Sequence, residues 1–378
     1  MNRLDDLSDG FASLAASAFA ALRGHEALTL RLEAEDQDYI RFNAGKVRQA
    51  TAVHQIRLRL DFQTDPHRAS HTLTLTGCLP DDVETVRTSV SCLRQTAAAL
   101  PPDPWIFPLT HHGSSHSDHP GQLVESHALM TELAELSRGT DFTGLLAQGR
   151  QIRANRNSLG QYHWFSCTNL FLDYSLYTVN AEGKNKAVKG FFAGSHWDRE
   201  RFAIQWASRQ RELAQLGKAN HRLPPGEYRV YLAPAAVDEL IGMISWGGSS
   251  YRAYREGRSA LARLFDARSS FSPLFTLEEN FGLGIAPRFN SLGLVDRGQA
   301  GSLLISSRTA TEYGVEANGA ETGEGLRSPQ VLPGQLAESD ALQALGTGLY
   351  IANLHYLNWS DESAARITGM TRYACFWV

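Results

Sequence analysis

Four histidines fall within nine residues of the sequence, where positions 111–119 read HHGSSHSDH. Imidazole is the commonest protein ligand for zinc, so these residue types are those of a metalloenzyme. A native zinc site, however, takes its ligands from separately anchored segments and fixes each ring by a hydrogen bond to a second residue. The glycine, serines and aspartate between the histidines give no periodicity that would hold the rings at fixed angles. We therefore predict a solvated loop here that is not a native ligand set.

A second chemically suggestive group lies near the end of the sequence, where His355 and Asn358 precede Cys375. Cysteine, histidine and asparagine together are the residue types of a thiol protease. Cys375 lies in the apolar run YACFWV, where burial is expected to raise its pKa and leave the thiol unreactive. No glycine-rich turn that would expose a nucleophile surrounds it. We therefore rank a self-sufficient thiol hydrolase below the functions described next.

Composition limits the class of protein. The chain has 378 residues, 43% of them hydrophobic, which suffices for a large core in two or three domains. A net charge of −4 leaves no cationic excess to neutralise phosphates, so we expect no nucleic-acid partner. Four cysteines without C-x-x-C spacing indicate a reducing cytoplasm. The start of the chain is acidic where a secretory signal is basic, and no stretch approaches about 20 apolar residues, so we expect no membrane partner.

The elements that must position any site follow from hydrophobic periodicity. Apolar residues at helical spacing predict helices at 1–24, 81–100, 124–137, 197–216, 235–246 and 339–345. Period-two alternation predicts strands at 27–35, 38–51, 54–62, 71–77, 145–160, 161–180, 186–195, 227–234 and 348–359. The glycine-rich segment 313–335 lacks a hydrophobic pattern and is predicted to be a long loop. The pattern predicts an α+β fold, with an N-terminal domain of mainly antiparallel sheet with helices.

The clearest domain boundary is the segment 218–227, KANHRLPPGE, with two prolines and a glycine. It separates an N-terminal α+β domain, residues 1–217, from a β-rich C-terminal domain, residues 228–378. The sequence stops on the apolar aromatic run at Val378, which suggests a sheet whose next elements are missing. We therefore expect the C-terminal domain to lack its last part.

Four segments together resemble the TldD/TldE family, also called the PmbA or modulator-of-DNA-gyrase family. They are GLLAQGRQIRANRNSLGQYHWFSCTNLFLDYSLYT, KAVKGFFAGSHWD, LPPGEYRVYLAPAAVDELIG and GLYIANLHYLNWSDESAARITGMTR. Their order and spacing, spread along most of the chain, carry the resemblance. It implies a two-domain α+β protein whose C-terminal domain is of the TldD/TldE type, and a dimeric peptidase system.

In that family, the resemblance implies, the TldD type carries zinc on a His-Glu-x-x-x-His motif and the TldE type lacks the motif. The corresponding position of this sequence holds Asp238, Glu239 and Met243, so only the glutamate is retained. A thioether is a poor zinc ligand and cannot replace a basic imidazole. The sole His-Glu pair, His25-Glu26, is followed by Ala-Leu-Thr-Leu and does not begin such a motif. We therefore expect no catalytic or metal-binding residue and no cofactor in this chain, with zinc in a TldD-type partner.

The implied function is that of a TldE/PmbA-like subunit without catalytic residues, in a cytoplasmic metallopeptidase complex that degrades unfolded polypeptides or processes precursor peptides. Whether the chain is itself an enzyme stays open. The alternative is a stand-alone homodimer that binds peptides or modulates a topoisomerase without proteolysis. The partner is accordingly a TldD-like subunit or a second copy of this chain. His355, Asn358, Asp361 and Arg366 are the predicted peptide-binding or interface residues.

Overall fold

The computed structural model describes Leu4 and residues 6–282 and 291–378, and its mixture of helices and largely antiparallel sheets confirms the predicted α+β class. The chain divides into two compact units: residues 1–174 with 191–199, and residues 175–190 with 200–378. The predicted domain boundary at 218–227 stays a prediction. Among the described residues, no helix is long and apolar enough to cross a membrane.

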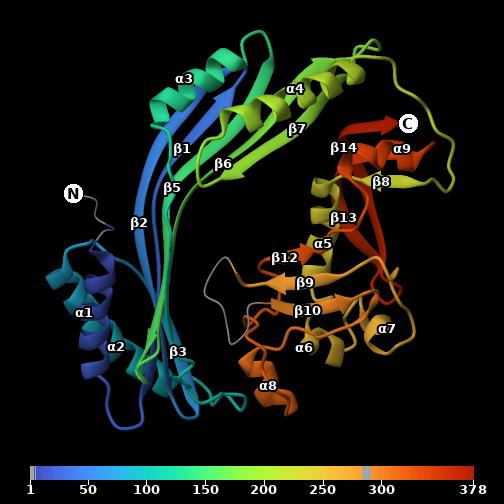
Figure 1. Ribbon diagram of the computed structural model, residues 1–378. Helices are drawn as coiled ribbons and strands as arrows, with labels where there is room; N and C mark the ends of the chain where they lie inside the picture. Colours follow the sequence, from blue (N-terminus) through green and yellow to red (C-terminus); the bar gives the residue numbers. More distant parts are fainter. Residues whose placement is uncertain (1–3, 5, 283–290) are drawn as a thin grey trace. The chain divides into compact units, whose positions relative to one another are not determined.

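A seven-stranded sheet dominates the first unit, and two of its strands, β6 and β7, run on into residues 175–190 (Figure 1). Its strands are β1 (Ala27–Asn43), β2 (Lys46–Thr64), β3 (His67–Thr74), β4 (Ser114–His119), β5 (Asp141–Asn157), β6 (Tyr162–Val179) and β7 (Asn185–Gly194). They are ordered β3-β2-β1-β5-β6-β4, and β7 pairs with β6 off this path. β1 is antiparallel to both β2 and β5, whereas β4 runs parallel to β6.

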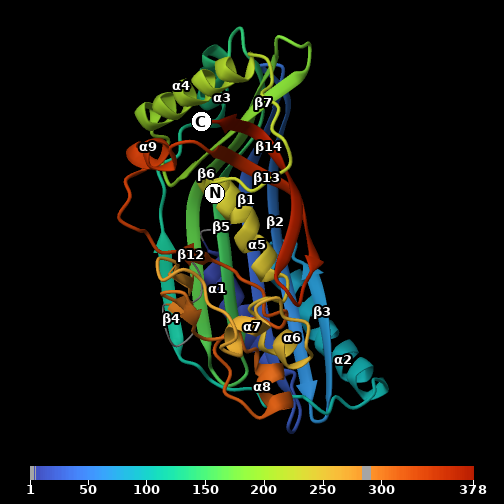
Figure 2. The ribbon, with the colours of Figure 1, turned by 90° about the vertical axis from the view of Figure 1, so that its right-hand side faces the viewer.

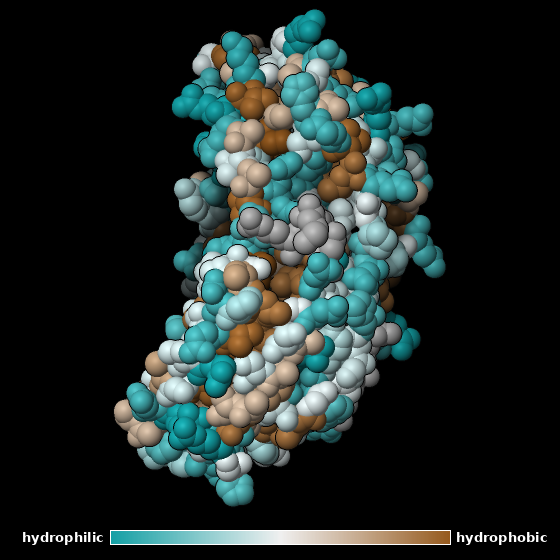
Figure 3. Space-filling model, turned by 90° about the vertical axis from the view of Figure 1, so that its left-hand side faces the viewer, coloured by the Kyte–Doolittle hydropathy of each residue, from teal (hydrophilic) through white to brown (hydrophobic). Residues whose placement is uncertain are grey.

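Alternation along β1 separates the two faces of this sheet. Leu28, Leu30 and Leu32 are buried in the core. Arg31 and Glu33, whose side chains point to the opposite face, are exposed. The helices α1 (Leu7–Ala20), α2 (Leu79–Ala99) and α3 (Ser126–Leu136) lie on the buried side (Figure 1). α1 and α2 contribute to one continuous apolar core with β1 and β2. Figure 3 views this helix-bearing side, where the exposed hydrophobic residues form small groups between hydrophilic ones. On the opposite face, which we call the open face, no helix formed by the described residues of the first unit lies (Figure 1).

Two predictions for this unit were wrong. Residues 27–35 and 38–51 were expected to be separate strands, but β1 runs without a break to Asn43, and the chain turns at Ala44 and Gly45. Both turn residues have positive φ, at 51° and 69°. The histidine segment, predicted to be a loop, forms β4 from Ser114 to His119. β4 pairs with β6, 48 positions further along the chain, and this pairing satisfies its backbone hydrogen bonds. The local sequence gives no sign of such a distant partner.

The second unit contains two smaller sheets and several short helices (Figure 2). One sheet has the order β14-β13-β8, formed by β8 (Val230–Leu232), β13 (Leu349–Asp361) and β14 (Arg366–Trp377). The other has the order β11-β10-β9-β12, formed by β9 (Leu277–Asn280), β10 (Ser291–Asp296), β11 (Gln299–Ala300) and β12 (Pro329–Val331). The helices are α4 (Arg199–Leu216), α5 (Pro234–Ser245), α6 (Tyr251–Arg255), α7 (Ala262–Phe265), α8 (Ser307–Tyr313) and α9 (Ala341–Leu345), with a 3₁₀ turn at Glu338–Asp340. The sequence did not predict α6, α7, α8, β9 to β12 or β14, and β12 falls inside the predicted loop 313–335.

A buried carboxylate organises the glycine-rich part of this unit. Glu324, only 1% exposed, accepts hydrogen bonds from Ser250 Oγ at 2.6 Å, the Arg252 amide at 3.0 Å and the Ser306 amide at 2.8 Å. Ser250 and Ser306 are the N-cap residues of α6 and α8. One side chain therefore ties together the starts of two helices. Burial alone would raise the pKa of Glu324, but these hydrogen bonds outweigh burial and hold that pKa below its usual value.

We expect Gly149→Ala to destabilise the first unit. Gly149 lies opposite Gln37, and a Cβ there would lie 2.1 Å from the Asp36 carbonyl oxygen and 2.7 Å from the Gln37 Cα. Overpacking against backbone costs about 1–3 kcal/mol or more. The control is Gly10→Ala in α1, where no atom lies within 4 Å of the new Cβ; helix propensity predicts stabilisation by about 0.5–1 kcal/mol. Urea unfolding measures both, and equal effects would contradict the geometry.

We expect Glu324→Gln to lower the free energy of unfolding by about 1–3 kcal/mol at neutral pH, since charge-assisted hydrogen bonds are lost from a buried group. Because the folded-state pKa of Glu324 is lowered from 4.5, its contribution is fully present above about pH 4.5 and disappears as the pH falls through the folded-state pKa. The difference from the native chain should therefore shrink on acidification. Exposed Glu321→Gln is the control, with little effect expected. A difference that persists undiminished in acid would refute this role of the charge.

Candidate functional site

Asp238, Glu239 and Met243, which the resemblance assigns to the position of the zinc motif, lie on α5, directly after β8. That assignment stays a prediction. α5 packs along β13 within the second unit (Figure 2). Asp238 and Glu239 are exposed, whereas Met243 is 3% exposed. The two positions that would have to supply ligands to one ion thus face different surroundings.

Within residue 4 and residues 6–282 and 291–378, no three His, Cys, Asp or Glu side chains are grouped so that they could hold a metal ion. On α5 the donor set itself is unsuited to zinc, since it offers a carboxylate and a thioether where the motif has two imidazoles.

His355 and Asn358 lie on β13, and the hairpin that β13 makes with β14 is irregular there. The pairing register shifts between His355 and Asn358. Tyr356, inside this bulge, has φ +50° and is 73% exposed. A positive φ is uncommon for a non-glycine residue, and such residues cluster at functional sites. His355 is half-buried and its Nε2 lies 2.9 Å from the Arg372 guanidinium on β14. The bulge therefore presents a histidine, an arginine and an exposed tyrosine together.

Asp361 and Arg366 face each other where the hairpin closes. Asp361 accepts hydrogen bonds from Ser363 Oγ at 2.8 Å and from the Ala364 amide at 3.1 Å. These bonds, with the charge of Arg366, hold the pKa of Asp361 below its usual value. The geometry gives Asp361 a role in the turn itself. The four predicted residues thus share one hairpin, and their contact with a peptide or a partner stays a prediction.

Cys375 is poorly placed to act as a nucleophile. It pairs with Ile351, whereas His355 pairs with Met370. Burial raises the pKa of the Cys375 thiol, which donates a hydrogen bond to the Arg372 carbonyl oxygen at 3.4 Å. The ring of His355 lies within hydrogen-bonding distance of Arg372. Neither the proximity nor the pKa needed for a thiol protease is present at this pair.

The histidines of β4 have fixed partners. His116 Nε2 lies 2.7 Å from Asp118, which also accepts a hydrogen bond from Trp164 Nε1 at 3.2 Å. Ser115 Oγ lies 2.8 Å from His163 on β6, on the other face of the strand. Because successive side chains of a strand point to opposite faces, His116 and His119 do not converge. The cluster seen in the sequence is thus dispersed in space.

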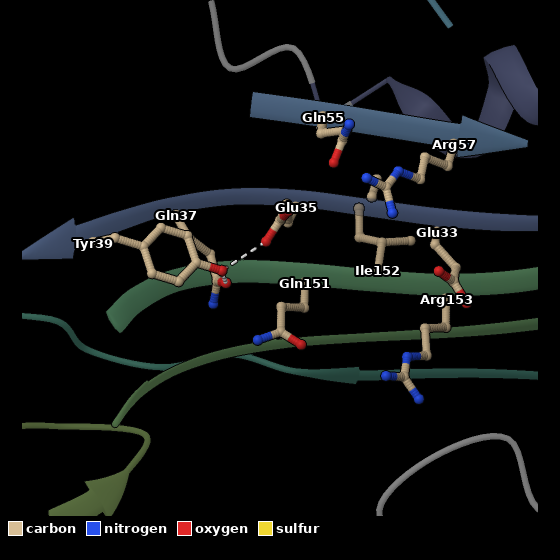
Figure 4. A pocket seen from close by; sticks show the side chains of 10 residues that line it. Glu33, Glu35, Gln37, Tyr39, Gln55, Arg57, Gln151, Ile152 and Arg153 are labelled. Carbon is tan, nitrogen blue, oxygen red and sulfur yellow. Dashed lines mark hydrogen bonds between the residues drawn. The ribbon is translucent and has the colours of Figure 1, made fainter. Parts of the chain in front are cut away.

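The sequence did not reveal a polar depression on the open face of the first unit, which we call the sheet groove (Figure 4). Its cavity of about 240 Å³ is lined by Glu33, Ala34, Glu35, Gln37, Tyr39, Gln55, Arg57, Gln151, Ile152 and Arg153. These residues come from β1, β2 and β5, and the pairing register brings them together. The only signal in the sequence was the placing of charged residues at alternate positions of each strand.

Comparison with known proteins assigns both the second half and the fold. A profile of the PmbA/TldA metallopeptidase C-terminal domain matches residues 225–378. No curated protein matches the sequence. Three solved structures have the same fold over most of the chain. Their sequence identities with this chain are 12–14%, so the similarity establishes the fold alone.

A candidate modulator of a DNA gyrase from Thermotoga maritima has a TM-score of 0.72 at 12% identity, covering 97% of this chain and 88% of that chain. TldE from Thermococcus kodakarensis has a TM-score of 0.68 at 12% identity, covering 91% and 82%. A candidate modulator of DNA gyrase from Bacteroides thetaiotaomicron has a TM-score of 0.71 at 14% identity, covering 97% and 90%.

We expect Cys375 to be alkylated more slowly than Cys92 when the folded chain is exposed briefly to iodoacetamide at pH 8. Cys92 is exposed, whereas Cys375 is partly buried with a raised pKa, and the thiolate is the reactive form. Mass spectrometry of the digested protein measures both rates, with urea-unfolded protein as the control in which the difference should vanish. Faster labelling of Cys375 would revive the thiol-hydrolase interpretation.

Proposed function

We propose, since this chain belongs to the TldD/TldE family, that it is a non-catalytic, TldE-like subunit of a metallopeptidase complex. A TldD-type partner supplies zinc and cleaves the peptide, and this chain completes the complex. The substrates are unfolded polypeptides or precursor peptides. We also propose a cytoplasmic location, in keeping with four cysteines that form no disulfide.

One observation supports this proposal: the helix that follows β8 holds Asp238, Glu239 and Met243, the residues that the resemblance assigns to the position of the zinc motif. Two imidazoles and an adjacent glutamate are what activates water on zinc, because the histidines hold the ion and the glutamate acts as base. Here the glutamate alone remains, and it points to solvent. A chain that has this fold but lacks the zinc ligands is suited to be a subunit that binds a peptide or a partner and does not cleave.

Binding of an extended peptide is physically available to such a chain. A peptide that adds as a strand to the edge of a sheet is held by main-chain hydrogen bonds, which show little preference for sequence. In the three-stranded sheet β14 is a terminal strand, and the bulge at Tyr356 lies on the neighbouring β13. His355 and Asn358 are therefore proposed to contact peptide or partner at this hairpin, with Asp361 and Arg366 shaping its end.

The second candidate is a homodimer that binds peptides or modulates a topoisomerase without proteolysis. The names of two similar structures, both candidate modulators of DNA gyrase, favour it. Because the net charge of this chain is −4, such a modulator would bind the topoisomerase itself and not its DNA.

The test is reconstitution. We expect the purified chain to contain substoichiometric zinc by elemental analysis and to cleave no unfolded casein, and we expect cleavage to appear when a TldD-type protein is added. A TldD-type protein whose zinc-binding histidines are replaced by alanine is the control, and its mixture with this chain should be inactive. Chelator-resistant hydrolysis by this chain alone would overturn the proposal. Exclusive formation of a homodimer, with no complex on gel filtration, would favour the second candidate.

A further inference from the structure

We propose that the sheet groove binds a short zwitterionic peptide of about two residues, through both of its charged ends. The α-carboxylate is bound by Arg57 and Arg153, and the α-ammonium is bound by Glu35. This function is separate from the role proposed above, because it needs neither zinc nor a partner subunit. All residues that line the groove belong to the first unit.

The charges of the groove are separated into two rows across the strands. In one row Glu33 lies directly opposite Arg57 on β2 and Arg153 on β5, which gives a net charge of +1. Because residues 33 and 35 are two positions apart on β1, the second row lies about 7 Å further along the strand.

The second row has the opposite sign. Here Glu35 lies opposite Gln55 and Gln151, which gives a net charge of −1. The row beyond Glu33, with Arg31 and Arg59, extends the positive end, although Asp61 lies 3.2 Å and 2.9 Å from these two arginines. The groove therefore has a cationic end and an anionic end.

The groups at the cationic end have unused hydrogen-bonding capacity. Within the described part of the chain, the side chains of Arg57, Arg153 and Glu33 form no hydrogen bond or ion pair, even though the residues are neighbours across the strands. A guanidinium has five N–H donors and binds a carboxylate through two parallel hydrogen bonds. Figure 4 shows both arginines at the same end of the groove. Two such groups with free donors form a suitable site for one carboxylate.

The anionic end is held in place by a tyrosine. The Tyr39 hydroxyl lies 2.8 Å from Glu35 Oε2 and 2.7 Å from Gln37 Oε1 (Figure 4). Of the side-chain polar atoms of Glu35 and Gln37, this leaves Glu35 Oε1 and the Gln37 amide nitrogen without a hydrogen bond among the described residues. The position of Gln37 is itself fixed, since it is 5% exposed and lies opposite Gly149 on β5. Glu35 is thus a positioned carboxylate of the kind that binds an ammonium group.

The spacing of the two ends selects the length of the ligand. An extended chain advances about 3.3–3.6 Å per residue, so the termini of a dipeptide lie about 7 Å apart, which equals the distance between the rows. A cavity of about 240 Å³ lies below the usual range for drug-sized ligands, which suits a small peptide. Single amino acids are too short to reach both ends, and longer peptides place one terminus outside. A dipeptide-sized cleavage product has both charges at the required separation.

The experiment is isothermal titration of the full chain, without added zinc or partner, with L-alanyl-L-alanine at low ionic strength. We expect saturable binding of one dipeptide, and at least about tenfold weaker binding of N-acetyl-alanyl-alanine and of alanyl-alanine amide, since each lacks one charge-assisted contact. Free alanine and tetra-alanine should also bind about tenfold more weakly or worse. Since no cleavage is involved, failure here would leave the proposed subunit role untouched, and the reverse also holds.

Two variants assign the two ends. The double variant Arg57→Gln/Arg153→Gln should weaken binding of the dipeptide by about tenfold or more and should no longer distinguish it from its amide. Glu35→Gln should weaken binding similarly and should no longer distinguish the dipeptide from its N-acetyl form. Arg87→Gln and Glu84→Gln, at exposed positions of α2, are the matched controls and should bind as the native chain does. Circular dichroism and thermal unfolding establish that every variant is folded.

Three results would overturn the proposal. One is the absence of binding by the native chain at about 10 mM dipeptide, since even millimolar affinity would be detected there. Another is equal binding of the dipeptide and its doubly blocked form, which would show that the terminal charges are not recognised. The third is unchanged affinity in both groove variants, which would place the bound peptide elsewhere on the chain.

Discussion

The pairing register of β1 with its two neighbours is the constraint on which the first unit depends. β1 pairs with β2 along all of its length and with β5 over residues 29–42. Side chains of a strand alternate between faces, so a slip by one residue would turn the core leucines outward and bury arginines and glutamates. The free energy of burying that apolar face therefore also fixes which charged side chains meet on the open face. Glu33 faces two arginines because Leu32 is buried in the core.

A different device holds the second unit, where hydrophobic periodicity is weak and the segments are short. In this unit, buried carboxylates accept hydrogen bonds from main-chain amides. Glu324 joins the N-caps of α6 and α8, and Glu279, fully buried on β9, accepts hydrogen bonds from the amides of Arg327 and Ser328. A buried carboxylate with several N–H donors satisfies amides that would otherwise be unpaired, and it fixes irregular backbone without a helix or sheet ladder. The glycine-rich segment around Glu324 is thereby anchored at particular points.

The sequence predicted elements well where the period was long and regular. α2, β5 and β6 were predicted close to their observed limits, because a sustained alternation or a helical stripe reports directly which side is buried. β4 was missed because its partner strand is distant in sequence and its own residues are polar. The short strands β9 to β12 were missed for a related reason, since their pairing is not encoded by local propensity. Tertiary context overrides local pattern in such segments.

The candidate sites differ in the same way: one lies within a local segment, and the other is assembled from distant segments. The helix that holds Asp238, Glu239 and Met243 after a strand was predictable, because its hydrophobic pattern is local, while its correspondence to the zinc motif stays a prediction. The sheet groove was not predictable, since Glu33, Arg57 and Arg153 come from three strands and only the register brings them together. Single charged residues on an alternating strand look like ordinary solvent-facing positions when each strand is considered alone. Only when three strands are paired does the order of signs across them become visible.

The proposed lack of zinc ligands on α5 is physically compatible with this fold, because zinc binding and the fold would depend on different residues. α5 keeps its place through its packing along β13, while Met243 is buried and Asp238 is exposed. A residue that binds a metal has to point its donor atom at a site that the other ligands share, and this restricts which side chains the position can hold. Once the requirement is removed, position 243 is free to hold an apolar side chain that stabilises the helix. A subunit that only binds peptide or partner can therefore be as well folded as one that carries the metal, and the proposed division of labour asks for no compensating change elsewhere in the second unit.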